Sequence, residues 1–260
     1  MQINEICVYL APMNLSALSN GDWIWLCLGA LLIGMAKAGI SGVGMLAVPI
    51  MAAIFGGKPS SGLVLPMLII ADMFAVVYYK RHAQWPHIWA LLPAAALGVL
   101  LGLAVGYWAD DRLFAQLIAI IVFASLGLML WQEFRGLPAR FTGNRIFSWT
   151  FGLLGGFSTM IGNAAGPVLN TYLLSTRLSK DHFIGTAAWF FFIVNLFKLP
   201  FHIWVWHTVN KESILLNLAV IPAIALGIYI GIRTVRLIPE REFRYFIIVA
   251  TIVASLKLLW

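Results

Sequence analysis

Three charged side chains lie inside long apolar segments of this sequence: Lys37, Asp72 and Lys198. At membrane depth a lysine costs about 2.5–3.5 kcal/mol on insertion scales unless another group offsets its charge, and such residues usually serve a function. Lys37 directly precedes a glycine-rich turn, so we predict that it binds the negative charge of a substrate. The alternative is structural: Lys37 pairs with Asp72 or caps the carbonyls at the end of its own helix.

Asp72 is the carboxylate placed deepest in an apolar segment, and a shift of 123 residues places Asn195 at the corresponding position of the second half of the chain. Asp72 either carries a coupled proton or cation or is the counter-charge of Lys37, and the sequence leaves both open. Lys198 lies toward the end of the apolar segment 182–207. We expect it to extend its ammonium group to the outer membrane interface rather than to contact a substrate.

Two glycine-interrupted apolar segments, residues 34–49 and 155–174, are each predicted to form a helical hairpin. Glycine lets the backbone reverse and lets a ligand approach closely. The second arm of each hairpin would begin at the turn, where unpaired amides and the positive end of the helix dipole attract an anion. The predicted substrate-binding residues are Lys37, Gly39, Ser41, Gly42, Gly44, Gly162, Asn163, Gly166, Asn170 and Tyr172. Ser158 and Thr159 are expected to bond to neighbouring helices instead.

The hairpins belong to two copies of one unit, residues 23–132 and 148–260. Shifts of 122 and 129 residues match Gly34 with Gly156, Gly44 with Gly166, Pro93 with Pro222, and Gly98 with Gly227. Duplicated hydrophobic units with interrupted segments at corresponding places are typical of secondary transporters, whose site lies where the broken segments meet.

Each copy is predicted to hold its hairpin and three further segments of about 20 apolar residues, the length that crosses a bilayer. The predicted segments are 23–41, 43–56, 60–80, 87–108, 112–132, 148–163, 165–176, 182–207, 213–234 and 242–260. The hairpin arms of the second copy are too short to cross, so each hairpin should enter and leave on one side. The two copies then run in opposite directions. The predicted fold class is an all-α membrane protein with an inverted-topology tandem repeat.

Positive residues flank these segments unevenly, which predicts the orientation. With the N-terminus outside, eleven would be cytoplasmic: Lys80, Arg81, Arg135, Arg140, Arg145, Arg177, Lys180, Arg233, Arg236, Arg241 and Arg244. Four would be outside: Lys58, Arg112, Lys211 and Lys257. The positive-inside rule therefore places residues 1–22 in the periplasm, the linker 133–147 in the cytoplasm and the C-terminus in the periplasm.

The composition excludes several classes of function. With 62% hydrophobic and 10% charged residues, the chain is too apolar for a soluble domain, so a lipid bilayer is its expected surrounding. The net charge of +7 comes from scattered residues without a basic stripe, so no nucleic acid is expected. Two cysteines and five histidines show no metal-binding spacing. No nucleophile and base share one depth, so neither a cofactor nor an enzymatic activity is expected.

Three stretches carry a more specific signal: GISGVGMLAVP from Gly39, NAAGPVLNTYLL from Asn163, and KDHFIGTAAWFFFIVNLFKLPF from Lys180. Together they resemble the sulfite exporter TauE/SafE family, also called the toluene-sulfonate uptake permeases, over about residues 23–260. One departure is Gly42-Val43-Gly44, where many members have three adjacent glycines. The resemblance implies a bacterial inner-membrane carrier of a small anion such as sulfite or an organosulfonate.

Two functional hypotheses follow for the site between the hairpin turns. The first is a secondary transporter, which couples transport to a proton or cation. Its candidate coupling or charge-partner residues are Asp72, Asn195 and Lys198. The alternative is an anion-selective, channel-like pore, which needs no coupling group.

Overall fold

The computed structural model describes residues 18–40, 42–135 and 145–234, together with residues 249, 252 and 256. Within these ranges the fold is all-helical, without a β-strand. The helices are α2 (Asn20–Lys37), α3 (Val43–Phe55), α4 (Gly57–Tyr79), α5 (Trp85–Trp108), α6 (Asp111–Arg135), α7 (Arg145–Gly162), α8 (Gly166–Ser175), α9 (Lys180–Trp204), α10 (Lys211–Ala219) and α11 (Ile221–Thr234). Ser41, nearly all of the predicted segment 242–260 and most of the linker 133–147 lie outside the described residues.

In the described ranges, four helices are long and apolar enough to cross a bilayer: α4, α5, α9 and residues 111–131 of α6. Helices α10 and α11 pass the same test only together, and they are bent by 46°. The predicted continuous segment 213–234 is therefore broken. Pro222 explains the break, because proline lacks the N–H that would continue a helix but fits its first turn. The chain is a multi-pass membrane protein.

The hairpin turns use residues that tolerate a left-handed backbone. Between α2 and α3, Gly39 and Gly42 have φ angles of 103° and 90°, where a side chain would be strained. Between α7 and α8, Asn163 has a φ of 52°, which asparagine accepts more readily than most residues. The Asn163 N–H bonds to the Thr159 carbonyl at 3.1 Å and ends α7. Because α2 contacts α3 and α7 contacts α8, both predicted hairpins are present.

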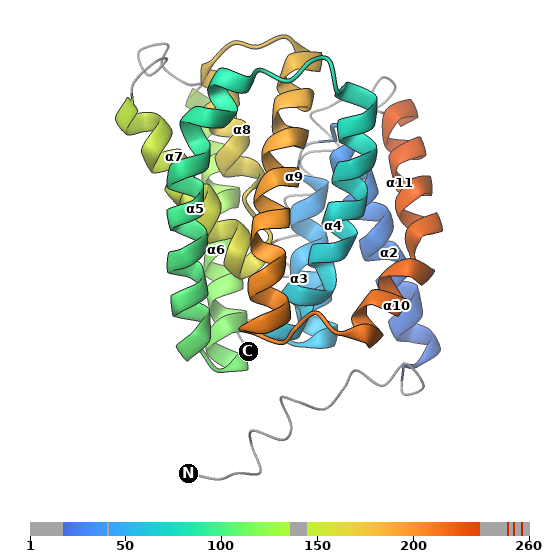
Figure 1. Cartoon of the computed structure of the whole chain (residues 1–260). Helices are drawn as coiled ribbons and strands as arrows, with labels where there is room; N and C mark the ends of the chain where they lie inside the picture. The colour runs from blue at the N-terminus through green and yellow to red at the C-terminus, as the bar shows by residue number, and fades with distance from the viewer. Residues whose placement is uncertain are drawn as a thin grey trace.

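The outer ends of the two hairpins lie at opposite ends of the bundle (Figure 1). Helix α2 starts and α3 finishes at the end that holds the loops 109–110 and 205–210, which we call the Trp108 end. Helix α7 starts and α8 finishes at the end that holds the loops 80–84 and 176–179, which we call the Lys80 end. Both turns lie inside the bundle, so the elements that follow them begin at depth.

Helices of the two halves approach each other closely at glycines. Helix α2 packs against α11, and α7 packs against α5. At five glycines a Cβ atom would overlap the backbone of the opposite helix: Gly34 at Ile224, Gly227 at Leu31, Gly152 at Leu91, Gly156 at Ala95, and Gly98 at Leu153. Small residues permit such close approach of membrane helices. The first arm of each hairpin thus packs on a helix of the other half.

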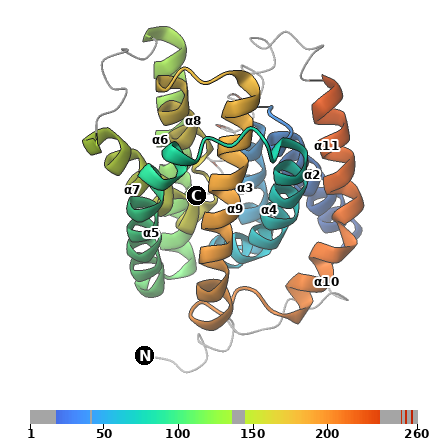
Figure 2. The same cartoon turned by 45° about the horizontal axis from the view of Figure 1, so that its top comes forward.

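The centre of the bundle is formed by α4 and α9, which lie side by side (Figure 2). Large apolar side chains cover the outside: Trp89, Tyr107 and Trp108 are 64%, 60% and 84% exposed. Such a surface suits the membrane, where tryptophan and tyrosine also favour the interfaces. Among the described residues, the fully buried charged side chains are Asp72 and Lys198, which lie on α4 and α9 in the centre.

Candidate functional site

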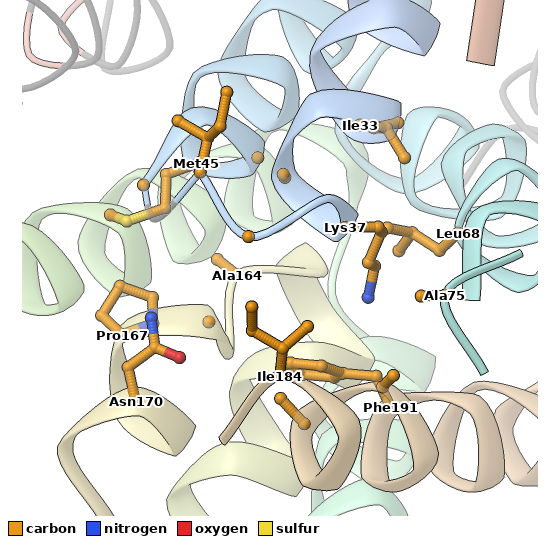
Figure 3. A pocket seen from close by; sticks show the side chains of 18 of the residues that line it. Ile33, Lys37, Met45, Leu68, Ala75, Ala164, Pro167, Asn170, Ile184 and Phe191 are labelled. Atoms are coloured by element: carbon orange, nitrogen blue, oxygen red, sulfur yellow. The ribbon is translucent and has the colours of Figure 1, made fainter. Parts of the chain in front are cut away.

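A cavity of about 580 Å³ lies where both hairpin turns meet α4 and α9. Its volume falls in the range of about 300–1,000 Å³ that small-molecule sites occupy. The predicted site residues that line it are Lys37, Gly39, Gly42, Gly44, Asn163, Gly166, Asn170 and Asn195. Figure 3 shows Lys37 and Asn170 on opposite sides of the pocket, with Ile184 between them. The two hairpins and the central helices therefore share one cavity.

The cavity opens toward the Lys80 end. Along α9 its wall runs from Lys180, at that end, to Asn195. Lys180 and Leu174 on this rim are exposed, whereas Val64 on α4 is 2% exposed. None of the described residues from Lys198 onward lines it. The described part of the chain thus forms a pocket that is closed toward the Trp108 end.

A charged pair joins the first hairpin to α4. The Lys37 Nζ atom lies 2.6 Å from Asp72 Oδ1, and Asn195 Nδ2 donates a 2.7 Å hydrogen bond to Asp72 Oδ2. The ammonium group also lies 4.2 Å from the centroid of the Phe191 ring, a cation–π contact. Asp72 is fully buried, but the Lys37 side chain keeps 13% of its surface exposed. Lys37 therefore pairs with Asp72, as the structural alternative predicts, and still lines the cavity.

Lys198 does not reach the membrane interface, so that prediction was wrong. Its side chain is fully buried, and its ammonium group donates to the Thr159 carbonyl at 2.7 Å, to Thr159 Oγ1 at 3.0 Å and to Asn163 Oδ1 at 2.7 Å. These acceptors lie at the C-terminal end of α7, where the helix dipole favours a cation. Asn163 Nδ2 in turn donates to the Ser61 carbonyl at 3.1 Å. The Lys198 ammonium group is therefore bound by acceptors inside the protein and not by groups at the membrane interface.

Among the described residues, the formal charges at and directly beneath the floor of the cavity do not balance. Two lysines, Lys37 and Lys198, accompany one carboxylate, Asp72. The acceptors that Lys198 contacts are neutral oxygens. An uncompensated buried charge costs several kcal/mol, so a small anion in the cavity would stabilise this cluster.

Two helix N-termini line the same cavity. Helix α3 begins after Gly42 and α8 begins after Ala165, and neither cap residue makes a side-chain hydrogen bond to the helix. The first amides of a helix have no partner within it, and they favour negative charge. A Cβ atom at Gly166 would meet nothing within 4 Å, so the backbone is accessible at this turn. This arrangement can accept an anion from both hairpins.

The sulfite exporter TauE/SafE family model matches residues 26–258. The chain belongs to the TauE/SafE family. Membership implies a membrane transporter of sulfur-containing anions and not an enzyme. No curated protein and no solved structure matches the chain.

Not every residue predicted for the TauE/SafE site lines the cavity. The Tyr172 hydroxyl accepts a hydrogen bond from Ser148 at 3.3 Å and lies 3.3 Å from His87 Nδ1, beside α5 and α7. Because Tyr172 follows Asn170 by two positions on α8, the two side chains point to different faces. A Cβ atom at Gly162 would face Ile118 of α6, and Gly162 does not line the cavity. Helical periodicity, applied along α8, would have separated Tyr172 from the site.

The structure also shows cavity-lining residues that were not predicted from the sequence. Lys180, Ile184 and Phe191 line the cavity from α9, and their spacing from Asn195 places them on one face of that helix. Ser158 Oγ donates to the Leu154 carbonyl of its own helix at 2.7 Å, rather than to the neighbouring helix that was expected. In the described ranges, no group of three His, Cys, Asp or Glu residues is placed to hold a metal ion.

Proposed function

We propose that the chain is a secondary transporter that moves a small anion, sulfite or an organosulfonate, across the bacterial inner membrane through the cavity between the hairpin turns. The observation that supports the proposal is the unbalanced charge at and directly beneath the cavity floor, where, among the described residues, Lys37 and Lys198 accompany one carboxylate, that of Asp72. An anion that enters from the Lys80 end meets this charge together with the N-termini of α3 and α8.

The lining suits a sulfite or sulfonate group. Its oxygens are acceptors, and the cavity offers the Lys37 ammonium, the Asn170 amide and the backbone at Gly166 as donors. The carbon chain of an organosulfonate can lie against Met45, Ile184 and other apolar side chains of the wall. A few placed polar groups in an apolar cavity are typical of a specific small-molecule site.

Two features support a carrier over a pore. The cavity is closed toward the Trp108 end, whereas a pore requires a continuous path. The crosswise packing of α2 on α11 and of α7 on α5, with hairpins that start at opposite ends, supports an inverted repeat. Inverted repeats permit access to one site from alternate sides of the membrane.

The proposed orientation has the Lys80 end in the cytoplasm and both termini in the periplasm. Among the described helix ends and loops, the Lys80 end carries Lys80, Arg81, Arg135, Arg145, Arg177, Lys180 and Arg233, against Lys58, Arg112 and Lys211 at the Trp108 end. The positive-inside rule then assigns the sides. A phosphatase that is active only after export, fused after Trp260, should be active. A fusion that is inactive there, with a fluorescent cytoplasmic reporter active at the same position, would contradict the orientation.

Binding of sulfite to the purified protein, measured by calorimetry, tests the proposed function. Lys37→Gln leaves one lysine against one carboxylate, so the affinity should fall by at least about tenfold. Asp72→Asn leaves both lysines unopposed, so the affinity should not fall. Lys211→Gln changes an exposed lysine at the far end and is the matched control. If wild-type protein binds neither sulfite nor any organosulfonate, the proposal is wrong.

The proposed coupling group is Asp72, whose replacement by Asn copies the residue at Asn195. Because exchange needs binding and alternation without net proton movement, Asp72→Asn protein in liposomes should still exchange radiolabelled sulfite. Uptake driven by a pH gradient should fail in the same liposomes. Normal accumulation by the variant would exclude Asp72 as the coupling group.

A further inference from the structure

Beyond the floor of the cavity, polar side chains continue along one face of α9 toward the Trp108 end. Asn195, Lys198 and His202 are spaced three and four positions apart, which places them on the same face of the helix. Their exposed fractions are 1%, 0% and 0%. Buried polar groups in a membrane protein are expensive, so a line of them indicates a role beyond packing.

His202 is the member of this line with an unused polar atom. Its Nδ1 atom lies 2.9 Å from Thr208 Oγ1, whereas Nε2 is buried and has no hydrogen-bond partner among the described residues. When the Thr208 hydroxyl donates to Nδ1, the ring proton is on Nε2, which is then an unused donor. A buried polar group without a partner costs about 1–3 kcal/mol.

The outer end of the line lies near Lys58, whose backbone N–H donates to the Asp111 carboxylate at 2.9 Å. The Trp206 ring meets the His202 ring edge-on, with centroids 4.9 Å apart. The Lys58 ammonium lies 5.6 Å from the centroid of the same Trp206 ring. Thr208, the hydrogen-bond partner of His202, is partly exposed. The line therefore reaches the surface beside a lysine.

Helix α4 forms the opposite side of the line. Ser61 is 3% exposed, its carbonyl accepts from Asn163 Nδ2 at 3.1 Å, and its Oγ donates to the Met160 carbonyl at 3.4 Å. One position along, a Cβ atom at Gly62 would overlap Thr208. The second hairpin, α4 and the loop 205–210 thus close around Lys198 and His202.

We infer that Lys198 and His202 form a second station for the transported anion, closed in this conformation, on the route from the cavity to the Trp108 end. The inference rests on the proposed function, because it describes the path of the same anion. Lys198 here uses its N–H groups on Thr159 and Asn163 of the second hairpin. When that hairpin moves away from α9, the ammonium and the His202 Nε2 donor become available to the oxygens of a small oxyanion.

Thiol accessibility tests the route. In a chain with Cys7→Ser and Cys27→Ser, we compare Ser61→Cys with Ser125→Cys, because both serines are 3% exposed and both donate to a backbone carbonyl, Ser125 to Ala164 at 3.3 Å. During sulfite exchange in liposomes, a membrane-impermeant thiol reagent applied at the Trp108 end should label Ser61→Cys at least about tenfold faster than Ser125→Cys. Equal labelling rates while exchange proceeds would overturn the route.

Substitution of His202 tests the station. His202→Phe leaves the charges of the cavity unchanged, so sulfite affinity should stay within about threefold of wild type while exchange falls by at least about tenfold. His202→Gln offers a donor again and should restore part of the exchange. Asn217→Leu, which removes a buried amide that bonds the Leu63 carbonyl at 3.1 Å, is the control outside the line.

The outcomes separate the two proposals. Wild-type protein that neither binds nor exchanges sulfite rejects the proposed function itself. Wild-type exchange together with normal exchange by His202→Phe overturns only the second station. Loss of sulfite binding by a folded His202→Phe protein also overturns it, because His202 would then act on the cavity that is open in this structure.

Discussion

The two hairpins end at the same cavity but hold their charges differently. In the first half, the lysine is on the hairpin, and Lys37 pairs with the carboxylate of Asp72 on α4 at 2.6 Å. In the second half, the lysine is on the central helix, and Lys198 of α9 bonds to the Thr159 carbonyl of the hairpin at 2.7 Å. The shift of 122 residues places Thr159 opposite Lys37. Each half thus joins its hairpin to its central helix through one lysine. In the first half this lysine is on the hairpin, and in the second half it is on the central helix.

In the proposed repeat, this difference means that the charges are distributed differently between the two halves. The glycine contacts are matched, with Gly34 and Gly156 each against a helix of the other half. If the hairpins move during transport, Lys37 moves with the first hairpin, whereas Lys198 stays on α9 when the second hairpin moves. The two joints should also differ in strength, because removing Lys37 leaves the Asp72 carboxylate without its cation, whereas removing Lys198 leaves only neutral acceptors without a donor.

The largest effect on stability is expected for Lys37→Met. Loss of the lysine leaves Asp72 as a buried carboxylate without its closest cation, so the free energy of unfolding should fall by about 3–5 kcal/mol. The double variant Lys37→Met/Asp72→Asn should recover most of the loss. Thermal unfolding in detergent measures both. A double variant that is no more stable than Lys37→Met would show that the ion pair is not what holds this joint.

A smaller loss is expected for Lys198→Met. The substitution leaves two buried acceptors, the Thr159 carbonyl and Asn163 Oδ1, without their donor, and this loss outweighs the relief from removing the uncompensated lysine charge, so the free energy of unfolding should fall by about 2–3 kcal/mol. The same thermal unfolding measurement checks it. A loss larger than that of Lys37→Met would reverse the ranking of the two joints.

The smallest effects are expected where the halves agree. An alanine at Gly156 or Gly227 would overlap the backbone of Ala95 or Leu31, and each should cost about 1–2 kcal/mol after the gain in helix propensity. Gly127→Ala is the control, because a Cβ atom there meets nothing within 4 Å. Clearly unequal losses at Gly156 and Gly227 would contradict the equivalence of the two contacts.

The hairpins could be predicted from sequence because their signals are local. Glycine at positions such as Gly39 and Gly42 permits φ angles that few other residues adopt, and the apolar arms of the second hairpin are too short to cross a bilayer. The break between α10 and α11 was missed, although Pro222 marks it, because the apolar run 213–234 is long enough to read as one crossing.

The partners of the charged residues could not be predicted in the same way. Snorkelling of Lys198 is a reasonable expectation for a lysine toward the end of an apolar segment, but it assumes that no acceptor lies closer than the interface. The nearest acceptors, on Thr159 and Asn163, come from a hairpin 39 and 35 residues away in sequence. The prediction that Tyr172 lines the site had the opposite problem. Tyr172 is close in sequence to Asn170 but lies on another face of α8.

By itself, the sequence determined the class of molecule: composition requires a bilayer, repeated glycines require two hairpins, and the motifs around them identify the TauE/SafE family. These properties depend on residue type and short-range spacing. Only the tertiary structure decided that Lys37 meets Asp72, that Lys198 is buried against the second turn, and that the cavity opens toward the Lys80 end. These depend on which helices become neighbours, and close packing between distant segments determines that, beyond the reach of any local pattern.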